Sequence, residues 1–259
     1  MKPILICLLA VLALTTQMPA QAQTLQGGNE QYDISDQIIQ HSHERSKYFV
    51  KSSIFDLGMS HEEFLKVADK SKPVVVHLHG CSGIGRDEWE IKSFYTGLGF
   101  NFVLTNFLNR GDASVSCTVS NRSLTYHGNL QTRLPARAKE LVHHIDWLRA
   151  NGFGKIIVTG HSEGGMIMQV FRTSVEAVII HSMACIPTPK PPPKENRYLQ
   201  LVSTNDPLLD PRRGTYPCEG RPGYENFTTS LSSVASHSPF ADPRWKDTVR
   251  QFLGVQEQD

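Results

Sequence analysis

The sequence feature that most constrains the fold is a serine set between two glycines, in the pattern Gly160-x-Ser162-x-Gly164. The β-branched run 155–159 comes directly before it, and the apolar stretch 166–168 comes directly after. A strand therefore ends and a helix begins at the serine. Glycines two residues away on either side let the backbone pass close to neighbouring segments in so sharp a turn. The pattern predicts a strand–turn–helix unit that presents Ser162 at the carboxyl end of a strand.

Strand and helix patterns alternate along most of the remaining chain. The expected strands are residues 48–55, 73–79, 100–107, 155–159, 175–181 and 198–203, and the expected helices are 60–69, 87–98, 134–151, 163–171 and 243–253. Nearly continuous β-branched strands are typical of a mostly parallel central sheet with helices on both faces. The proline-rich stretch 187–193 is too short to form a lid. We therefore expect one α/β domain over residues 48–259, without a substantial lid domain.

The N-terminus has the layout of a secretory signal peptide over residues 1–22. Lys2 precedes an apolar run at 4–14, and residues 20–22 (Ala-Gln-Ala) supply the small side chains that signal peptidase requires. An uncleaved membrane anchor is the alternative, but a bilayer needs about 20 apolar residues. Residues 23–47 form a polar lead-in. We expect an exported protein, periplasmic or secreted, that has no membrane contact after cleavage.

Charge and composition exclude several classes of partner. The 26 basic side chains nearly balance the 25 acidic ones, and the formal net charge is +1. Such a balance gives no reason to expect a nucleic acid or an anionic membrane as partner. The content of 39% hydrophobic and 20% charged residues is that of a globular protein. The sequence does not indicate an oligomeric state.

Four of the five cysteines remain after the expected cleavage, because Cys7 lies in the signal peptide. An even number in an oxidising compartment favours two disulfides, for which three connectivities are possible. The preferred pairs are Cys81 with Cys117 and Cys185 with Cys218, because each would join loops expected at the same edge of the sheet. Free buried cysteines are the alternative. None of the four has the spacing of a zinc site.

A serine nucleophile needs a base and an acid, which follow it in the order serine, acid, histidine in proteins with this turn. Asp206 follows the carboxyl end of the strand at 198–203 after two intervening residues, and Asp210 is a weaker candidate for the acid. His237 is the only histidine after Asp206. The alternatives are an ordinary turn aspartate before a proline and a structural histidine. The order predicts Ser162, Asp206 and His237 as catalytic residues.

The loop after the strand at 73–79 is the expected place for the second half of an oxyanion hole. Acyl transfer needs two backbone N–H groups that converge on the developing oxyanion, and the amides of Cys81 and Glu163 are the candidates. The side chain of Glu163 is expected to cap the following helix rather than to line the pocket. His77 and His79 are expected to be core and loop histidines, because no third metal ligand is evident.

Together, the histidine–glycine loop, the Gly-His-Ser-Glu-Gly-Gly turn at 160–165, Asp206 and His237 resemble the α/β-hydrolase superfamily. The resemblance covers about residues 73–254. The small layout without a lid is similar to the dienelactone hydrolase-like branch, although dienelactone hydrolases proper use cysteine where Ser162 stands. The turn also resembles that of prolyl-oligopeptidase-type catalytic domains, but no propeller domain precedes it. The resemblance implies an α/β-hydrolase fold and a hydrolase that requires no cofactor and no metal.

The expected function is that of a serine esterase, which cleaves a small acyl substrate through an acyl-enzyme intermediate. One alternative is a peptidase or amidase of the prolyl-oligopeptidase-like type. Another is a non-catalytic binding protein on a hydrolase scaffold, for which the loss of a catalytic residue would be the sign. No such loss is seen in the sequence.

Overall fold

The computed structural model describes residues 61–105, 117–120, 123–126, 130–185, 191–209 and 217–255. The expected signal peptide, the polar lead-in, the strand expected at 48–55 and Asp210 lie outside the described residues. Of the helices in these ranges, none is both long enough and apolar enough to cross a membrane.

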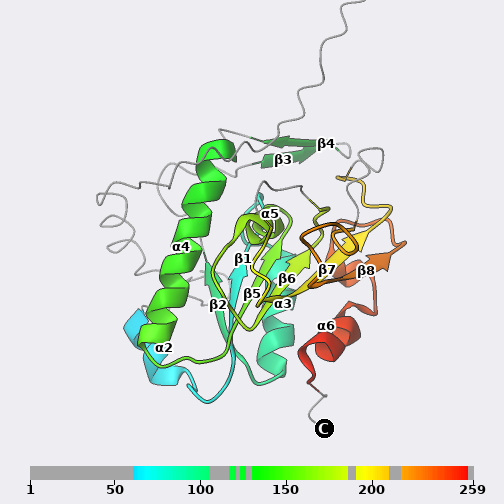
Figure 1. Cartoon of the computed structure of the whole chain (residues 1–259). Coiled ribbons are helices and arrows are strands. Elements are labelled where there is room, and N and C mark those ends of the chain that lie inside the picture. The colour runs from blue at the N-terminus through cyan, green and yellow to red at the C-terminus, as the bar shows by residue number, and fades with distance from the viewer. Residues whose placement is uncertain are drawn as a thin grey trace, which may run out of the picture.

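The centre of the protein is a six-stranded parallel sheet in the order β2-β1-β5-β6-β7-β8 (Figure 1). Its strands are β1 (Val74–Leu78), β2 (Asn101–Thr105), β5 (Ile156–His161), β6 (Ala177–His181), β7 (Arg197–Ser203) and β8 (Phe227–Ser232). The register sets Leu78 beside Gly160 and His161 beside His181. The loops after β1, β5 and β6 therefore begin at one edge of the sheet.

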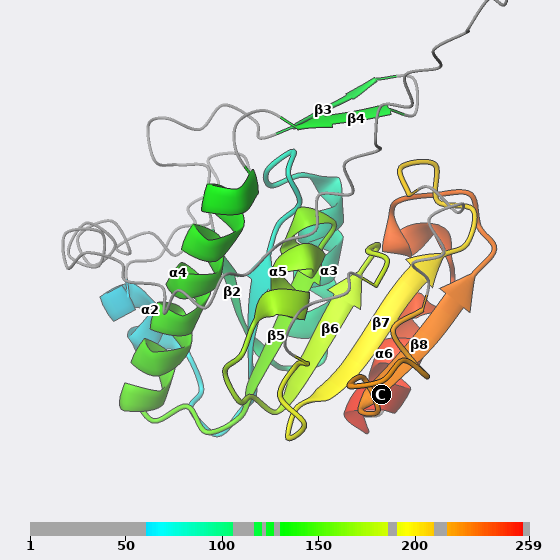
Figure 2. The same cartoon turned by 45° about the horizontal axis from the view of Figure 1, so that its top comes forward.

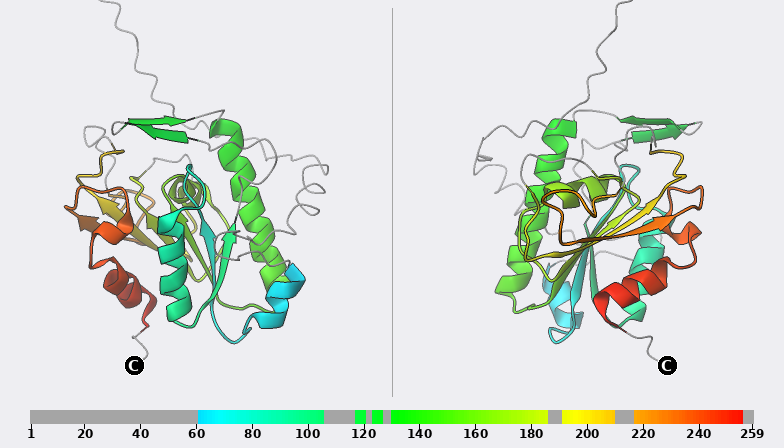
Figure 3. Two further views of the ribbon diagram at one scale, coloured as in Figure 1. Left: turned by 180° about the vertical axis from the view of Figure 1, so that it is seen from behind. Right: turned by 45° about the vertical axis from the view of Figure 1, so that its right-hand side comes forward.

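Helices cover both faces of this sheet, as the sequence predicts (Figure 3). One face carries α2 (His61–Val67), α4 (Leu130–Ala150) and α5 (Glu163–Val170), and the other carries α3 (Arg86–Gly97) and α6 (Trp245–Leu253), with the short η2 (Pro239–Ala241) before α6. In β1, Val74 and Val76 belong to the core beneath α4 and α5, whereas Val75 belongs to the core beneath α3 and α6. This alternation explains why the strands are apolar along their whole length.

Helix α4 begins at Leu130, four residues before the position that the sequence predicts, so Pro135 lies inside the helix and not in its first turn. A proline in a helix costs about 3 kcal/mol, because it removes one backbone hydrogen bond. The fully buried Leu141, Ile145 and Leu148 follow on the same helix. Burial of each such side chain stabilises the fold by about 1.5–3 kcal/mol. The apolar face therefore outweighs the proline.

Three strands are absent from the sequence-based prediction. Strand β8 (FTTSLS) lies at the edge of the sheet, and Phe227 is its only buried residue. Because an edge strand buries so little, its sequence is polar and lacks the apolar run that marks a central strand. Strands β3 (Cys117–Ser120) and β4 (Ser123–Tyr126) form a separate antiparallel hairpin. This hairpin lies beyond the carboxyl ends of the sheet strands (Figure 2).

Two disulfides join Cys81 to Cys117 and Cys185 to Cys218, which are the pairs preferred from the sequence. The first ties the loop after β1 to the β3–β4 hairpin. The second ties the segment after β6 to the segment between β7 and β8. Their sequence separations are 36 and 33 residues, and closing loops of this size stabilises a fold by about 4 kcal/mol each in the chain-entropy model.

Candidate active site

Ser162 lies at the turn between β5 and α5, where the sequence predicts a sharp bend. Its φ is 53° and its ψ is −114°, in a region that non-glycine residues rarely adopt. A Cβ on Gly160 would lie 2.4 Å from the backbone of Gly164, and a Cβ on Gly164 would lie 2.2 Å from the carbonyl oxygen of Leu78. Because only glycine fits at these two positions, the helix can start directly against the ends of β1 and β5.

Asp206 and His237 are brought together at the carboxyl edge of the sheet. The Nδ1 atom of His237 donates to Oδ2 of Asp206 at 2.7 Å. The other carboxylate oxygen of Asp206 accepts from the amide of Leu208 at 2.8 Å. The Asp206 side chain is fully buried, whereas that of His237 is partly exposed. The carboxylate therefore fixes the orientation of the imidazole and the proton on Nδ1.

The other ring nitrogen of His237 is available to accept a proton. Its Nε2 is buried and has no hydrogen-bond partner among the described residues, so it is not bonded to Ser162 in this structure. The His237 ring nevertheless lies beside the turn that carries the serine, because its centroid is 5.5 Å from that of His161. Hydrogen bonds between a catalytic base and its nucleophile are often longer without substrate.

His161, the residue before the serine, forms a buried ion pair with Glu88 of α3. The Nδ1 atom of His161 lies 3.1 Å from Oε1 of Glu88, and its Nε2 donates to the carbonyl oxygen of His237 at 3.4 Å. Burial by itself would lower the pKa of His161, but the hydrogen bond and the charge of Glu88 outweigh it and raise that pKa. Burial raises the pKa of Glu88, but the contact with His161 holds it well below its usual range.

The N-terminus of α3 also holds the loop of His237 through Asp87. The Ser238 hydroxyl donates to Oδ1 of Asp87 at 2.9 Å. This bond and the hydrogen bond from His161 to the His237 carbonyl hold the backbone around His237 in place. Two neighbouring carboxylates of one helix therefore contact the serine turn and the histidine loop.

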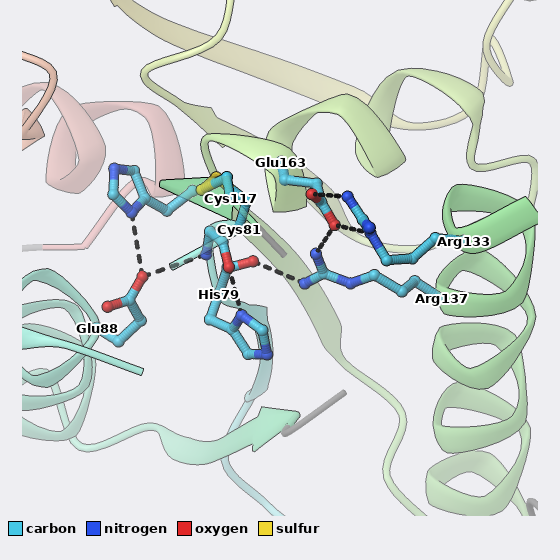
Figure 4. The surroundings of a disulfide bond; sticks show 9 residues. His79, Cys81, Glu88, Cys117, Arg133, Arg137 and Glu163 are labelled. Carbon is cyan, nitrogen blue, oxygen red and sulfur yellow. Dashed lines mark hydrogen bonds and ion pairs between the residues drawn. A yellow bond between two sulfur atoms is a disulfide. The ribbon is translucent and has the colours of Figure 1, made fainter. Parts of the chain in front are cut away.

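Glu163, the residue after the serine, is paired with two arginines of α4 (Figure 4). Arg137 donates to Oε1 of Glu163 at 2.6 Å, and Arg133 donates to both carboxylate oxygens, at 3.1 and 2.9 Å. Burial raises the pKa of Glu163, but the charges of Arg137 and Arg133 outweigh it and lower that pKa. The sequence-based prediction that this side chain caps α5 is wrong, because the carboxylate faces α4 instead.

The loop after β1 lies directly against the serine. A Cβ on Gly80 would lie 3.3 Å from the Cβ of Ser162, so the loop backbone passes close to that side chain. The amide of Gly80 donates to Glu88 at 3.3 Å, and the carbonyl of His79 accepts from Arg137 at 2.7 Å. Cys81, one of the two predicted oxyanion residues, follows this contact and is bonded to Cys117.

Sequence reasoning missed the charged residues that surround the serine. Glu88 lies in the first turn of α3, where an acidic residue is an ordinary helix-start signal. Arg133 and Arg137 are four residues apart and therefore share a helix face, but no sequence pattern pairs them with Glu163, 26 to 30 residues away. Only the packing of α4 beside α5 brings these charges together.

Besides His161, three histidines of the described residues are buried near the carboxyl edge of the sheet. His77 and His79 are fully buried, as the sequence predicts, and so is His181. Within the described part of the chain, neither ring nitrogen of His77 or of His181 has a hydrogen-bond partner. The described residues also contain no group of histidine, cysteine, aspartate and glutamate side chains that could hold a metal ion.

Burial of these histidines predicts a loss of stability in mild acid. Burial lowers the pKa of His77 to about 3, that of His79 to about 4, and that of His181 well below its usual value. The unfolded chain takes up protons as the pH falls through about 6.5, whereas the folded protein does not. Their contribution to stability is therefore present above about pH 6.5 and is lost as the pH falls. His161 has the opposite shift, so it adds nothing to this loss below pH 6.5.

We expect the free energy of unfolding to fall by about 4 kcal/mol per pH unit between pH 6 and 5, since each histidine contributes about 1.4 kcal/mol per unit. Urea unfolding at pH 7, 6 and 5 measures this slope. The variant His77→Leu removes one titrating group and is expected to reduce the slope by about a third. Stability that stays constant from pH 7 to 5 would contradict the prediction.

Comparisons with known proteins identify the fold. No protein-family model and no curated protein matches this sequence. Among solved structures, a carboxylesterase from Bacillus cereus is 15% identical and covers 72% of this chain and 90% of its own, with a TM-score of 0.50. An esterase from Pyrococcus furiosus is also 15% identical and covers 73% of this chain and 85% of its own, with a TM-score of 0.50. A dienelactone hydrolase-like phosphotriesterase from metagenomic libraries is 14% identical. It covers 71% of this chain and 87% of its own, with a TM-score of 0.47.

Such low identities show the fold alone. The parallel sheet order, the helices on both faces and the serine turn between β5 and α5 agree with that result. The protein has the α/β-hydrolase fold. This confirms the fold that the resemblance implies.

Proposed function

We propose that the protein is a serine hydrolase that cleaves carboxylic esters, with Ser162 as nucleophile, His237 as general base and Asp206 as the acid that orients it. The observation that carries the proposal is the Asp206–His237 hydrogen bond beside the strained serine turn. Nucleophile, base and orienting acid are the groups that acyl transfer requires. The esterases of similar fold support the choice of an ester over an amide.

In the proposed mechanism, the Ser162 hydroxyl attacks the ester carbonyl carbon and its proton passes to Nε2 of His237. The Asp206 carboxylate stabilises the resulting imidazolium. The oxyanion accepts hydrogen bonds from the amides of Cys81 and Glu163. His237 then protonates the departing alcohol, which leaves an acyl-enzyme. Water, deprotonated by His237, attacks the acyl carbon. The Ser162 oxygen then leaves and takes this proton back from His237, which releases the carboxylic acid and restores the free enzyme.

The proposal includes export of the protein. Two disulfides support an oxidising compartment, because thiols are kept reduced in most cytosols. Export agrees with the signal peptide expected at residues 1–22. The proposed substrate is a small acyl ester, with no nucleic acid or membrane as partner.

Labelling with a fluorophosphonate probe tests the proposed nucleophile. We expect the folded protein to be labelled at Ser162, as located by peptide mass spectrometry, and the heat-unfolded protein to stay unlabelled. The reason is that phosphonylation needs the serine activated by His237. Turnover of a nitrophenyl ester is expected to exceed that of an aminoacyl nitroanilide. A folded protein that never labels and hydrolyses neither substrate would instead favour a binding function.

A further inference from the structure

Arg137 contacts both halves of the proposed oxyanion hole. One guanidinium nitrogen donates to Oε1 of Glu163 at 2.6 Å, and the other donates to the carbonyl oxygen of His79 at 2.7 Å. Glu163 carries one of the proposed oxyanion amides, and His79 lies two residues before Cys81, which carries the other. Figure 4 shows Arg137 lying between these two groups. Its side chain is almost completely buried.

We propose that Arg137 is a positioning residue that holds the loop of His79 to Cys81 at a fixed distance from the serine turn. The inference rests on the proposed function, because it concerns the oxyanion hole of that reaction. A planar guanidinium suits this task, since its donors point in fixed directions and its charge does not titrate. A lysine could not hold both acceptors in this geometry.

Position matters because an oxyanion donor must lie about 2.7–3.1 Å from the developing charge. A misplacement of 1 Å can cost about 10²-fold in rate. The loop passes against Ser162 at Gly80, so a small shift of the loop changes where the Cys81 amide points relative to the serine. Arg137 opposes such a shift through its bond to the carbonyl just before Gly80.

Arg133 provides a matched control. It lies one helical turn before Arg137 and donates to the same carboxylate, with two hydrogen bonds. Within the described part of the chain, the arginine that donates to the His79 carbonyl is Arg137. The variant Arg137→Gln leaves the Arg133–Glu163 ion pair in place, and Arg133→Gln leaves the Arg137–Glu163 pair in place. Neither variant leaves Glu163 without a cationic partner.

Steady-state kinetics on an oxoester and its thionoester counterpart test the proposal. We expect Arg137→Gln to lower kcat for the oxoester about 10- to 100-fold with KM changed less than about twofold. We expect kcat for the thionoester to fall much less in this variant. Sulfur is a weak hydrogen-bond acceptor, so the thionoester gains little stabilisation from the oxyanion hole even in the wild type. Arg133→Gln is expected to lower kcat less than about threefold. Equal losses in the two variants, or equal losses on both esters, would overturn the proposal.

A second measurement does not depend on turnover. Hydrogen exchange of the peptide over residues 77–84 is expected to accelerate in Arg137→Gln and not in Arg133→Gln, because only the first variant releases the loop. If Arg137→Gln does not fold, Arg137→Lys keeps the charge, and it is expected to show the same loss of kcat and faster exchange. A wild-type protein without esterase activity or probe labelling would refute the proposed function. An active wild type whose exchange and kcat are unaffected by both substitutions of Arg137 would refute the positioning role alone.

Discussion

Replacement of Ser162 by alanine is expected to lower kcat/KM for an ester about 10⁶-fold while the protein stays folded. The magnitude follows from losses measured when the nucleophile of a catalytic triad is removed. Alanine keeps the Cβ and removes only the hydroxyl, so the strained turn at φ 53° and its glycine contacts can persist. The kinetics of the purified variant and its thermal unfolding measure the two parts of the prediction.

Ser182 offers a matched control for this experiment. It is also a buried serine with a positive φ, 55°, and it follows strand β6 at the same edge of the sheet. Ser182→Ala is expected to change kcat/KM less than about threefold, because no base–acid pair is proposed to act on it. Activity of Ser162→Ala within tenfold of the wild type, or an equal loss in Ser182→Ala, would refute Ser162 as the nucleophile.

Replacement of Asp206 by asparagine is expected to lower kcat about 10⁴-fold with the fold intact. The carboxylate accepts the Nδ1 proton of His237 at 2.7 Å and so keeps Nε2 unprotonated toward the serine. An asparagine that turns its amide group toward the ring favours the opposite tautomer, in which Nε2 carries the proton and cannot act as base. Kinetics on a nitrophenyl ester, with circular dichroism of the variant, provide the measurement.

Asp87→Asn is the appropriate comparison for the aspartate variant. Asp87 also contacts the loop of the histidine, through the Ser238 hydroxyl at 2.9 Å, but it has no direct bond to the His237 ring in the described residues. We expect Asp87→Asn to lower kcat less than about tenfold. A similar loss in both variants would indicate that loop placement, and not the tautomer of His237, explains the effect of Asp206.

The backbone of the site could be predicted from sequence because its constraints are local. A Cβ at position 160 or 164 would clash with neighbouring backbone atoms, so both positions require glycine. This requirement appears in the sequence as a short motif. The central strands are apolar on both faces, which is also a local pattern. Strand β8 was missed because an edge strand buries little and carries no such pattern.

The start of α4 was misplaced for a related reason. Proline is common in the first turn of a helix, so the sequence predicts that the helix starts at Leu134 and Pro135. In the structure the helix continues through it, because the apolar face that follows is buried against the sheet and α5. At the start of α4, burial of the apolar helix face therefore outweighs the preference of proline for the first turn of a helix.

The sequence alone determined the α/β alternation, the serine turn and the order of the candidate catalytic residues, since each depends on neighbours in the chain. Only the tertiary structure decided which charges surround the serine: Glu88 on one side, and Arg133 and Arg137 on the other. These ion pairs join helices on opposite faces of the sheet to residues on either side of Ser162. Because charge pairing across space leaves no periodic trace in a single sequence, it becomes visible only when the helices are packed.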